Sequence, residues 1–343
     1  MKINLPQEAS DIFYEVRELP TKDWECYWNN IFLPYKVKNK PLNYIVFAHE
    51  ASKRLTPSSL QMTFNLSKLI IFYGPPGNGK SKLARGLANR VATILNMRSK
   101  LRIIYVELNG HKLSSRWLGG SPQLVQKAFT YVKEIAQQAD VIFFMIDEVE
   151  SLLTNRALTL SEANPVDVFR TVNAVLQEID NLGQLNTSMF TIATSNLPKA
   201  IELAFLDRAD LKIFIDSPSE EYRKLILKDT LDEFIKVFRA KIDPENCAKM
   251  LVPTTEGFSA RQCRKILMEA IGSSTSLAIN PSALTCSDMA AAATEIRERM
   301  EKDKMSNGVY EYTFKRADEV KNKEDERELA DNLLLQKMMN DPQ

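Results

Sequence analysis

Short apolar runs alternate along the chain with longer stretches in which apolar residues recur every three or four positions. Five of these runs have the length of buried strands, at residues 69–73, 102–108, 141–146, 190–194 and 211–215. The stretches between them have the spacing of amphipathic helices, as in Phe169, Val172, Leu176 and Ile179. Strands that are apolar throughout and alternate with helices are typical of a parallel sheet covered on both faces. We therefore predict an α/β domain over residues 66–217.

The pattern changes on both sides of this domain. After Pro218 the strand pattern ends and three helical segments follow, which predicts a smaller helical domain over residues 218–300. Residues 1–65 are rich in aromatics and prolines, and we expect them to pack against the sheet domain. Charges crowd together toward the C-terminus, so residues 301–343 are predicted to be an exposed helix or a partly disordered tail.

Composition and charge argue against several kinds of function. The 343 residues are 44% hydrophobic and 26% charged, as expected for a globular protein with two domains. The net charge of +1 provides no field that attracts nucleic acid or an anionic membrane, so direct binding to either is not expected. The four cysteines form no C-x-x-C pair and the chain has two histidines, which argues against a zinc site.

A glycine-rich loop follows the first predicted strand directly. It consists of Gly74, Pro75, Pro76, Gly77, Asn78, Gly79, Lys80 and Ser81, which match G-x-x-x-x-G-K-[ST] between a strand and a helix. In this pattern backbone N–H groups surround phosphate oxygens, the lysine reaches the β- and γ-phosphates, and the hydroxyl ligates Mg²⁺. A loop that only turns a strand into a helix is the alternative. All fixed positions match in the required context, so we predict ATP and Mg²⁺ as cofactors.

Polar residues end two further strands at what should be the same edge of the sheet. Asp147 and Glu148 follow the strand at residues 141–146, and Asn196 follows the strand at residues 190–194. Ligands of parallel sheets bind at the carboxyl ends of the strands. We expect Asp147 to hold Mg²⁺, Glu148 to act as the general base on water, and Asn196 to orient that water or the γ-phosphate. Asn196 as a simple turn residue is the alternative.

These features in this order resemble the AAA+ ATPases. Residues 146–152, 172–176, 179–180, 194–196 and 204–210 are similar to the family of pachytene checkpoint protein two, which includes the thyroid-receptor-interactor orthologues and remodels HORMA-domain proteins. The resemblance extends over about residues 19–300. It implies an AAA+ P-loop domain with a five-stranded parallel sheet between helices, followed by a smaller helical lid domain.

The resemblance also implies a homohexamer with ATP between subunits. Arg208 matches the arginine finger that reaches a neighbour's site, with an intrachain ion pair to Asp207 or Asp210 as the alternative. In the lid, Arg261 matches the residue that senses the γ-phosphate, although Arg264 lies one turn further on.

A pore loop that grips substrate is implied at Trp117 and Leu118, in a glycine-flanked segment after the second strand. A buried Trp117 that anchors the following helix is the alternative. Residues 154–164 are expected to form a second pore loop.

The resemblance implies an ATPase that opens HORMA-domain proteins by pulling a segment through the ring, either directly or through a HORMA-like adaptor. It places the protein in the nucleus on meiotic chromosomes, and also in the cytoplasm or at the kinetochore, where it acts in chromosome-axis and spindle-checkpoint control.

Two other functions stay open. The family carries a folded N-terminal recognition domain, whereas about 70 residues precede the phosphate loop here, so we expect either a truncated form or a different mode of substrate capture. A nucleotide-dependent scaffold without remodelling activity is therefore one alternative. A DNA-acting motor is another, and the balanced charge weakens it.

Overall fold

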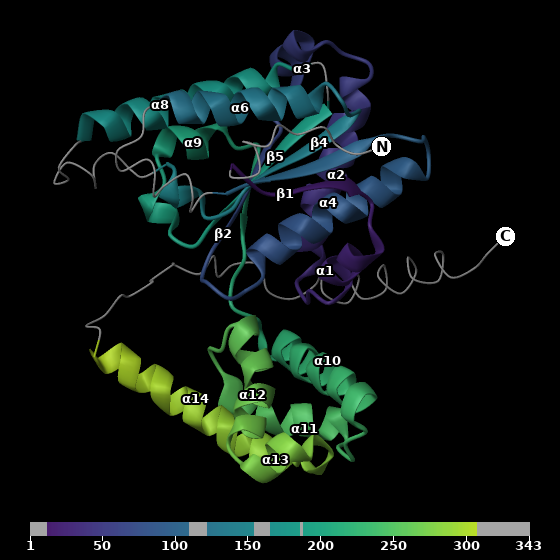
Figure 1. Cartoon of the computed structure of the whole chain (residues 1–343), viewed down its shortest axis with the longest axis vertical. Coiled ribbons are helices and arrows are strands. Elements are labelled where there is room, and N and C mark those ends of the chain that lie inside the picture. Colours follow the sequence, from purple (N-terminus) through teal and green to yellow (C-terminus); the bar gives the residue numbers. More distant parts are fainter. Residues whose placement is uncertain (1–11, 110–121, 154–164, 186–187, 307–343) are drawn as a thin grey trace, which may run out of the picture.

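The computed structural model describes residues 12–109, 122–153, 165–185 and 188–306. Its centre is a β-sheet (Figure 1). The sheet has six strands in the order β1-β3-β4-β5-β2-β6. The strands are β1 (Phe13–Leu19), β2 (Leu69–Tyr73), β3 (Ile103–Leu108), β4 (Val141–Ile146), β5 (Ser188–Ser195) and β6 (Leu211–Phe214). The last five are the predicted strands, and they pair in parallel.

The sequence pattern missed β1, which pairs antiparallel with β3 at the edge of the sheet. Only its two end residues, Phe13 and Leu19, are buried, and its interior is mostly polar. A half-exposed edge strand of this kind lacks the continuous apolar run by which the other five were found.

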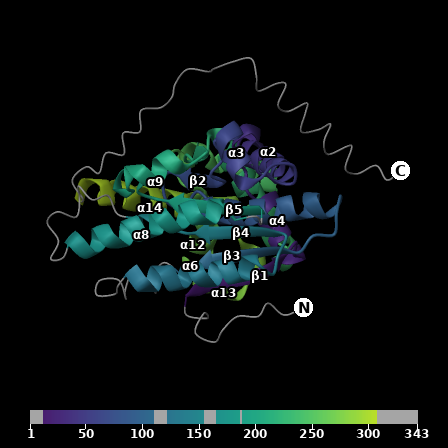
Figure 2. The same ribbon diagram turned by 90° about the horizontal axis from the view of Figure 1, so that it is seen from above.

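Helices cover both faces of the sheet (Figures 1 and 2). Alternate residues along each strand point to opposite faces, so Leu69 and Ile71 join one apolar cluster while Ile70 and Phe72 join the other. The first face packs against α6 (Pro122–Ala136), α8 (Pro165–Gly183) and α9 (Leu203–Arg208). The second packs against α1 (Glu25–Asn29), α2 (Tyr35–Ser52) and α4 (Lys80–Asn96), and α3 (Pro57–Phe64) contacts α2.

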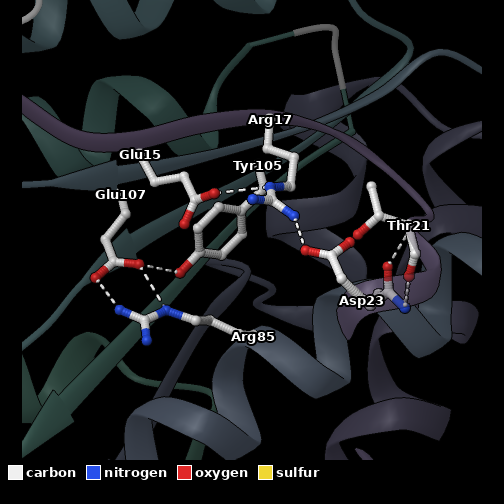
Figure 3. A network of polar contacts seen from close by, with 8 residues as sticks. Glu15, Arg17, Thr21, Asp23, Arg85, Tyr105 and Glu107 are labelled. Carbon is white, nitrogen blue, oxygen red and sulfur yellow. Dashed lines mark hydrogen bonds and ion pairs between the residues drawn. The ribbon is translucent and has the colours of Figure 1, made fainter. Parts of the chain in front are cut away.

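A buried ion pair joins α4 to the sheet (Figure 3). Arg85 of α4 donates through Nε and Nη2 to the two carboxylate oxygens of Glu107 on β3, at 2.9 and 2.6 Å. The Tyr105 hydroxyl donates to the same carboxylate at 2.7 Å. This carboxylate is thereby fully hydrogen-bonded, which a buried charge requires. The pair fixes α4, and the loop before it, against β3.

The residues after β6 form helices with an apolar cluster of their own, at one end of the molecule in Figure 1. They are α10 (Glu220–Phe238), α11 (Pro244–Leu251), α12 (Ala260–Gly272), α13 (Thr275–Ile279) and α14 (Cys286–Ser306). Short 3-10 helices lie at Lys22–Trp24, Val149–Ser151, Pro198–Ala200, Pro253–Thr255 and Pro281–Ala283. Ser259 and Gln262 form a capping box that starts α12. None of the described helices has the length and apolarity needed to span a bilayer.

Candidate nucleotide-binding site

The loop between β2 and α4 depends on glycine. Gly74 has φ +141°, and a Cβ there would collide with the carbonyl oxygen of Ile215. Gly77 and Gly79 have φ values of +84° and +85°, in the left-handed region that glycine adopts most easily. Such a backbone turns successive N–H groups to one side, and the N-terminal end of α4 adds its positive dipole. The loop is therefore built to bind an anion such as phosphate.

Lys80 lies at the mouth of this loop with 5% of its surface exposed. Its Nζ donates to the carbonyl oxygens of Gly74 and Pro75 at 2.9 and 2.8 Å. Burial lowers the pKa of Lys80 to about 8, although the carboxylates of Glu150, Asp147 and Glu148 oppose this shift. A desolvated ammonium held beside the loop is suited to bind a phosphate, because the anion would replace the lost hydration.

The two predicted magnesium ligands are in direct contact. The Ser81 hydroxyl donates to Asp147 Oδ1 at 2.7 Å, and the Thr194 hydroxyl donates to the same oxygen. In the described part of the chain, no group of three or more His, Cys, Asp or Glu side chains lies close enough to hold a metal. Mg²⁺ in phosphate-binding sites commonly takes one or two protein oxygens, with phosphate and water supplying the rest. Ser81 and Asp147 fit that donor set.

Glu148 has an unusual backbone, with φ +50° and ψ +56°. A left-handed conformation in a residue other than glycine is uncommon and is concentrated at functional sites. Its N–H donates to the Thr194 hydroxyl at 3.1 Å, and its Oε1 accepts from Asn196 Nδ2 at 2.9 Å. The structure thus brings Asp147, Glu148 and Asn196 together at the carboxyl edge of the sheet, where the sequence predicted them.

The lid approaches the same loop through the start of α12. The backbone N–H of Arg261 donates to the Gly77 carbonyl at 2.9 Å, and that of Ala260 donates to Asn78 Oδ1 at 3.1 Å. A Cβ on Gly77 would lie 3.2 Å from the Cβ of Arg261, so the first turn of α12 packs directly on the phosphate loop. Arg264 instead pairs with Asp229 at 3.0 Å. These contacts favour Arg261 over Arg264 as the residue directed at the phosphates.

Arg208 lies at the opposite edge of the sheet. Its backbone carbonyl accepts from the Ser67 hydroxyl, just before β2 begins, whereas the phosphate loop follows the end of β2. Its guanidinium pairs with Asp180 of α8, which is a different partner from the Asp207 or Asp210 that the sequence suggested. Asp207 Oδ1 lies 3.8 Å from Lys212 Nζ, and the Asp210 carboxylate accepts a hydrogen bond from the Tyr44 hydroxyl. Arg208 also lines a cavity of about 1220 Å³.

Two residues of the site were not singled out by the sequence pattern. The Thr194 hydroxyl bridges Asp147 and the Glu148 N–H, and Glu150 Oε1 accepts from the Asn196 N–H at 2.9 Å. Thr194 lies at the end of one predicted strand and Glu150 lies shortly after another, so both could have been found from their positions at the same edge of the sheet. The predicted pore residues Trp117 and Leu118, and the segment 154–164, lie outside the described residues.

The fold and this site define a P-loop nucleotide-binding protein of the AAA class. The model of the "ATPase family associated with various cellular activities (AAA)" matches residues 70–217. CD-NTase-associated protein 6 of Pseudomonas aeruginosa is 31% identical over 82% of this chain and 91% of its own length. The putative pachytene checkpoint protein 2 of Caenorhabditis elegans is 31% identical over 67% of this chain, which spans about half (53%) of that relative. The chain belongs to the AAA ATPase family of pachytene checkpoint protein 2, as its resemblance indicated.

Solved structures agree on the fold. The structure of C. elegans PCH-2 aligns with a TM-score of 0.68 and 23% identity, covering 84% of this chain and 75% of the other. A chain of the E. coli MS115-1 HORMA:CdnC:Trip13 complex aligns with a TM-score of 0.64 and 18% identity, covering 83% of this chain and 95% of the other. The predicted AAA+ fold class, a parallel sheet between helices followed by a smaller helical domain, is therefore confirmed, and the antiparallel β1 adds a sixth strand to the five that were predicted.

Proposed function

We propose that this chain hydrolyses ATP with Mg²⁺ and couples hydrolysis to the remodelling of HORMA-domain proteins. The observation that carries the chemistry is the continuous hydrogen-bonded set from Ser81 through Asp147 and Thr194 to Glu148 and Asn196. It joins the predicted metal ligands to the predicted base at one edge of the sheet.

Each residue has a distinct role in this proposal. Lys80 and the loop N–H groups bind the β- and γ-phosphates, and Ser81 and Asp147 hold the metal, which when bound neutralises phosphate charge. Glu148 accepts a proton from the attacking water at its carboxylate. Asn196 holds that carboxylate in place and lies where it can contact the water. Arg261 approaches the γ-phosphate from the lid.

The position of Arg208 supports assembly into a homohexamer with shared sites. Strand β2 separates the Arg208 edge of the sheet from the phosphate loop, and its five residues span roughly 16 Å at about 3.3 Å per residue. An arginine side chain cannot bridge that distance. Arg208 can therefore act on a phosphate only in another copy of the chain, and its side chain is 33% exposed, so it is accessible to such a copy.

The names of the relatives support HORMA-domain proteins as the substrate class. A solved relative forms part of a HORMA:CdnC:Trip13 complex, and other relatives are named as pachytene checkpoint proteins. We propose that Trp117 and Leu118 grip the substrate in the ring pore, directly or with a HORMA-like adaptor. The relatives include a bacterial protein as well as animal ones. The broader part of the proposal is therefore that HORMA-domain proteins are the substrates. Its more specific part is that the protein acts in the nucleus, in meiosis and in the spindle checkpoint.

The test compares the wild type with Glu148→Gln and Trp117→Ala. In ATP, Glu148→Gln should have the native mass of a hexamer, because it binds the nucleotide without turning it over. The wild type should hydrolyse ATP faster when a HORMA-domain protein is added. Trp117→Ala should keep basal hydrolysis and lose the opening of the HORMA protein. Hydrolysis with an unchanged HORMA protein would instead indicate the scaffold alternative, and a fully active monomer would refute the shared site.

A further inference from the structure

The loop between α1 and α2, residues 30–34, lies between the phosphate loop and the lid. On one side, the side chain of Ile31 lies 3.9 Å from where a Cβ of Gly79 would be. On the other side, Phe32 packs against the apolar cluster of the lid. The α1–α2 loop is thus in contact with both walls of the candidate nucleotide site.

This loop is fixed firmly to the sheet domain. Lys38 of α2 donates to the carbonyl oxygens of Trp28 and Ile31 at 2.8 and 3.1 Å, and its ammonium lies over the Trp28 ring. A Cβ on Gly86 of α4 would lie 2.7 Å from the Trp28 nitrogen, so α1 packs backbone to backbone on α4. Because α4 begins at the phosphate loop, the α1–α2 loop and the phosphate loop are both anchored on α4 and form one support.

Arg264 links the lid to that support. Its Nη1 donates to Asp229 Oδ2 at 3.0 Å and to the Thr230 hydroxyl at 3.3 Å, both on α10. Its Nη2 donates to the backbone carbonyl of Asn30 at 3.0 Å. One guanidinium therefore ties together α10, α12 and the α1–α2 loop. A lysine could not reproduce this geometry, because all its donors are on one nitrogen, whereas the two Nη atoms of arginine donate to acceptors on different segments.

The Arg264 hydrogen bonds hold α12, which is also the helix that carries Arg261. The first two N–H groups of α12 contact the phosphate loop at Gly77 and Asn78, and Arg264 holds the helix again one turn later. Residues three apart on a helix lie on neighbouring positions of its surface. Any rotation of α12 that broke the Arg264 contact would therefore move Arg261 relative to the phosphate loop.

We propose that Arg264 is a positioning residue: by tying α12 to the Asn30 carbonyl, it holds Arg261 in register with the γ-phosphate. The inference rests on the proposed nucleotide site and adds a residue that touches neither nucleotide nor metal. Arg261 distinguishes ATP from ADP through the γ-phosphate, so loss of Arg264 reduces the preference for ATP over ADP. Hydrogen bonds from a charged donor are among the stronger ones, but this one is partly exposed, so the expected reduction is about three- to tenfold.

The experiment uses the full chain and measures the dissociation constants of fluorescently labelled ADP and of a labelled non-hydrolysable ATP analogue. The variants are Arg264→Ala, Arg264→Lys, Arg261→Ala and the double alanine variant. Lys265→Ala is the matched control, because it removes the same charge from the next, exposed position of α12. Thermal melting of each variant checks the fold.

Arg264→Ala and Arg264→Lys should both weaken ATP binding more than ADP binding and raise the KM for ATP more than they lower kcat. The double variant should show no greater loss of ATP affinity than Arg261→Ala alone, since Arg264 acts through Arg261. Lys265→Ala should match the wild type. Equal losses of ATP and ADP affinity, additive effects, or full rescue by lysine would overturn the proposal. A wild type that binds neither nucleotide would refute the proposed function itself, which is a different result.

Discussion

Arg208 and Asp180 form a two-pronged ion pair, with Nε and Nη2 donating to the two carboxylate oxygens at 2.8 and 3.0 Å. Both side chains are partly exposed, at 33% and 46%. An exposed ion pair contributes about 0 to 1 kcal/mol, and the two-pronged geometry puts this pair toward the upper end of that range, whereas an arginine finger accelerates phosphoryl transfer by about 10³ to 10⁵. Transfer of Arg208 from Asp180 to a neighbour's phosphate is therefore energetically accessible.

The first prediction concerns Arg208→Ala. This variant should bind ATP with nearly unchanged affinity, because Arg208 lies at the edge of the sheet away from its own phosphate loop. Its hydrolysis rate should fall by about 10³ or more. Nucleotide binding and steady-state turnover of the purified variant measure the two effects separately.

A mixing experiment shows whether Arg208 acts between subunits. Lys80→Ala lacks the phosphate-binding ammonium but keeps Arg208, and Arg208→Ala has the reverse defect. Each variant alone should be inactive, while mixed assemblies should recover part of the activity at interfaces that combine the two intact residues. If mixing recovers nothing although mixed assemblies form, Arg208 does not act in trans.

The second prediction concerns Asn196, whose Nδ2 donates to Glu148 Oε1 at 2.9 Å. Asn196→Ala should lower single-turnover hydrolysis by about 10², because the base is no longer held. Asn196→Asp should lower the rate further, since a carboxylate cannot donate the hydrogen bond that Asn196 gives and would repel the charge of Glu148. Leu197→Ala, at the exposed neighbouring position, is the control. A rate for Asn196→Asp equal to the wild type would show that this contact has no part in catalysis.

The carboxyl edge of the sheet was predictable because its residues are marked locally. The glycine-rich loop has a fixed spacing, and Asp147 and Asn196 come directly after apolar strands, so parallel topology alone brings them together. The left-handed backbone of Glu148 could not be predicted in this way, since none of the residues 146–152 requires that conformation.

Contacts between distant segments were not predictable in the same way. The partner of Arg208 was expected among its sequence neighbours, yet it is Asp180, which is 28 positions away on another helix. The Arg264 contact to the Asn30 carbonyl spans 234 positions and uses a backbone acceptor that any residue provides. Such contacts depend on how the lid packs against the sheet domain, and one sequence alone does not specify that packing.

The third prediction concerns the buried pair of Arg85 and Glu107, in which the Glu107 side chain is 4% exposed. Glu107→Gln removes the charge that balances Arg85 and should lower the free energy of unfolding by about 3 kcal/mol, because an uncompensated charge remains buried. Glu15→Gln is the matched control, as Glu15 pairs with Arg17 in a partly exposed position of the same network (Figure 3). It should cost less than about 1 kcal/mol. Urea denaturation measures the free energy of unfolding of both variants. Equal losses would contradict the prediction, because they would mean that burial of Glu107 does not make its ion pair more important for stability.

The fourth prediction concerns His49 of α2, which is 3% exposed. Its Nδ1 lies 3.1 Å from the Ser188 hydroxyl, and its Nε2 has no hydrogen-bond partner among the residues that the structure describes. Burial lowers the pKa of His49 below its ordinary value. The nearby charges largely oppose one another, since Lys53 and Lys68 lower the pKa while Glu50 and Asp140 raise it.

A histidine whose pKa is lowered by folding is protonated more readily in the unfolded chain. The unfolded state therefore binds more protons once the pH falls below about 6.5, and stability decreases from there by at most about 1.4 kcal/mol per pH unit. His49→Gln in a His111→Gln background, compared with His111→Gln alone, isolates this effect because the chain has two histidines. Urea denaturation between pH 7.5 and 5.5 should show a steeper loss of stability when His49 is present. Parallel curves for the two variants would contradict the prediction, because they would mean that His49 is protonated as easily in the folded protein as in the unfolded chain.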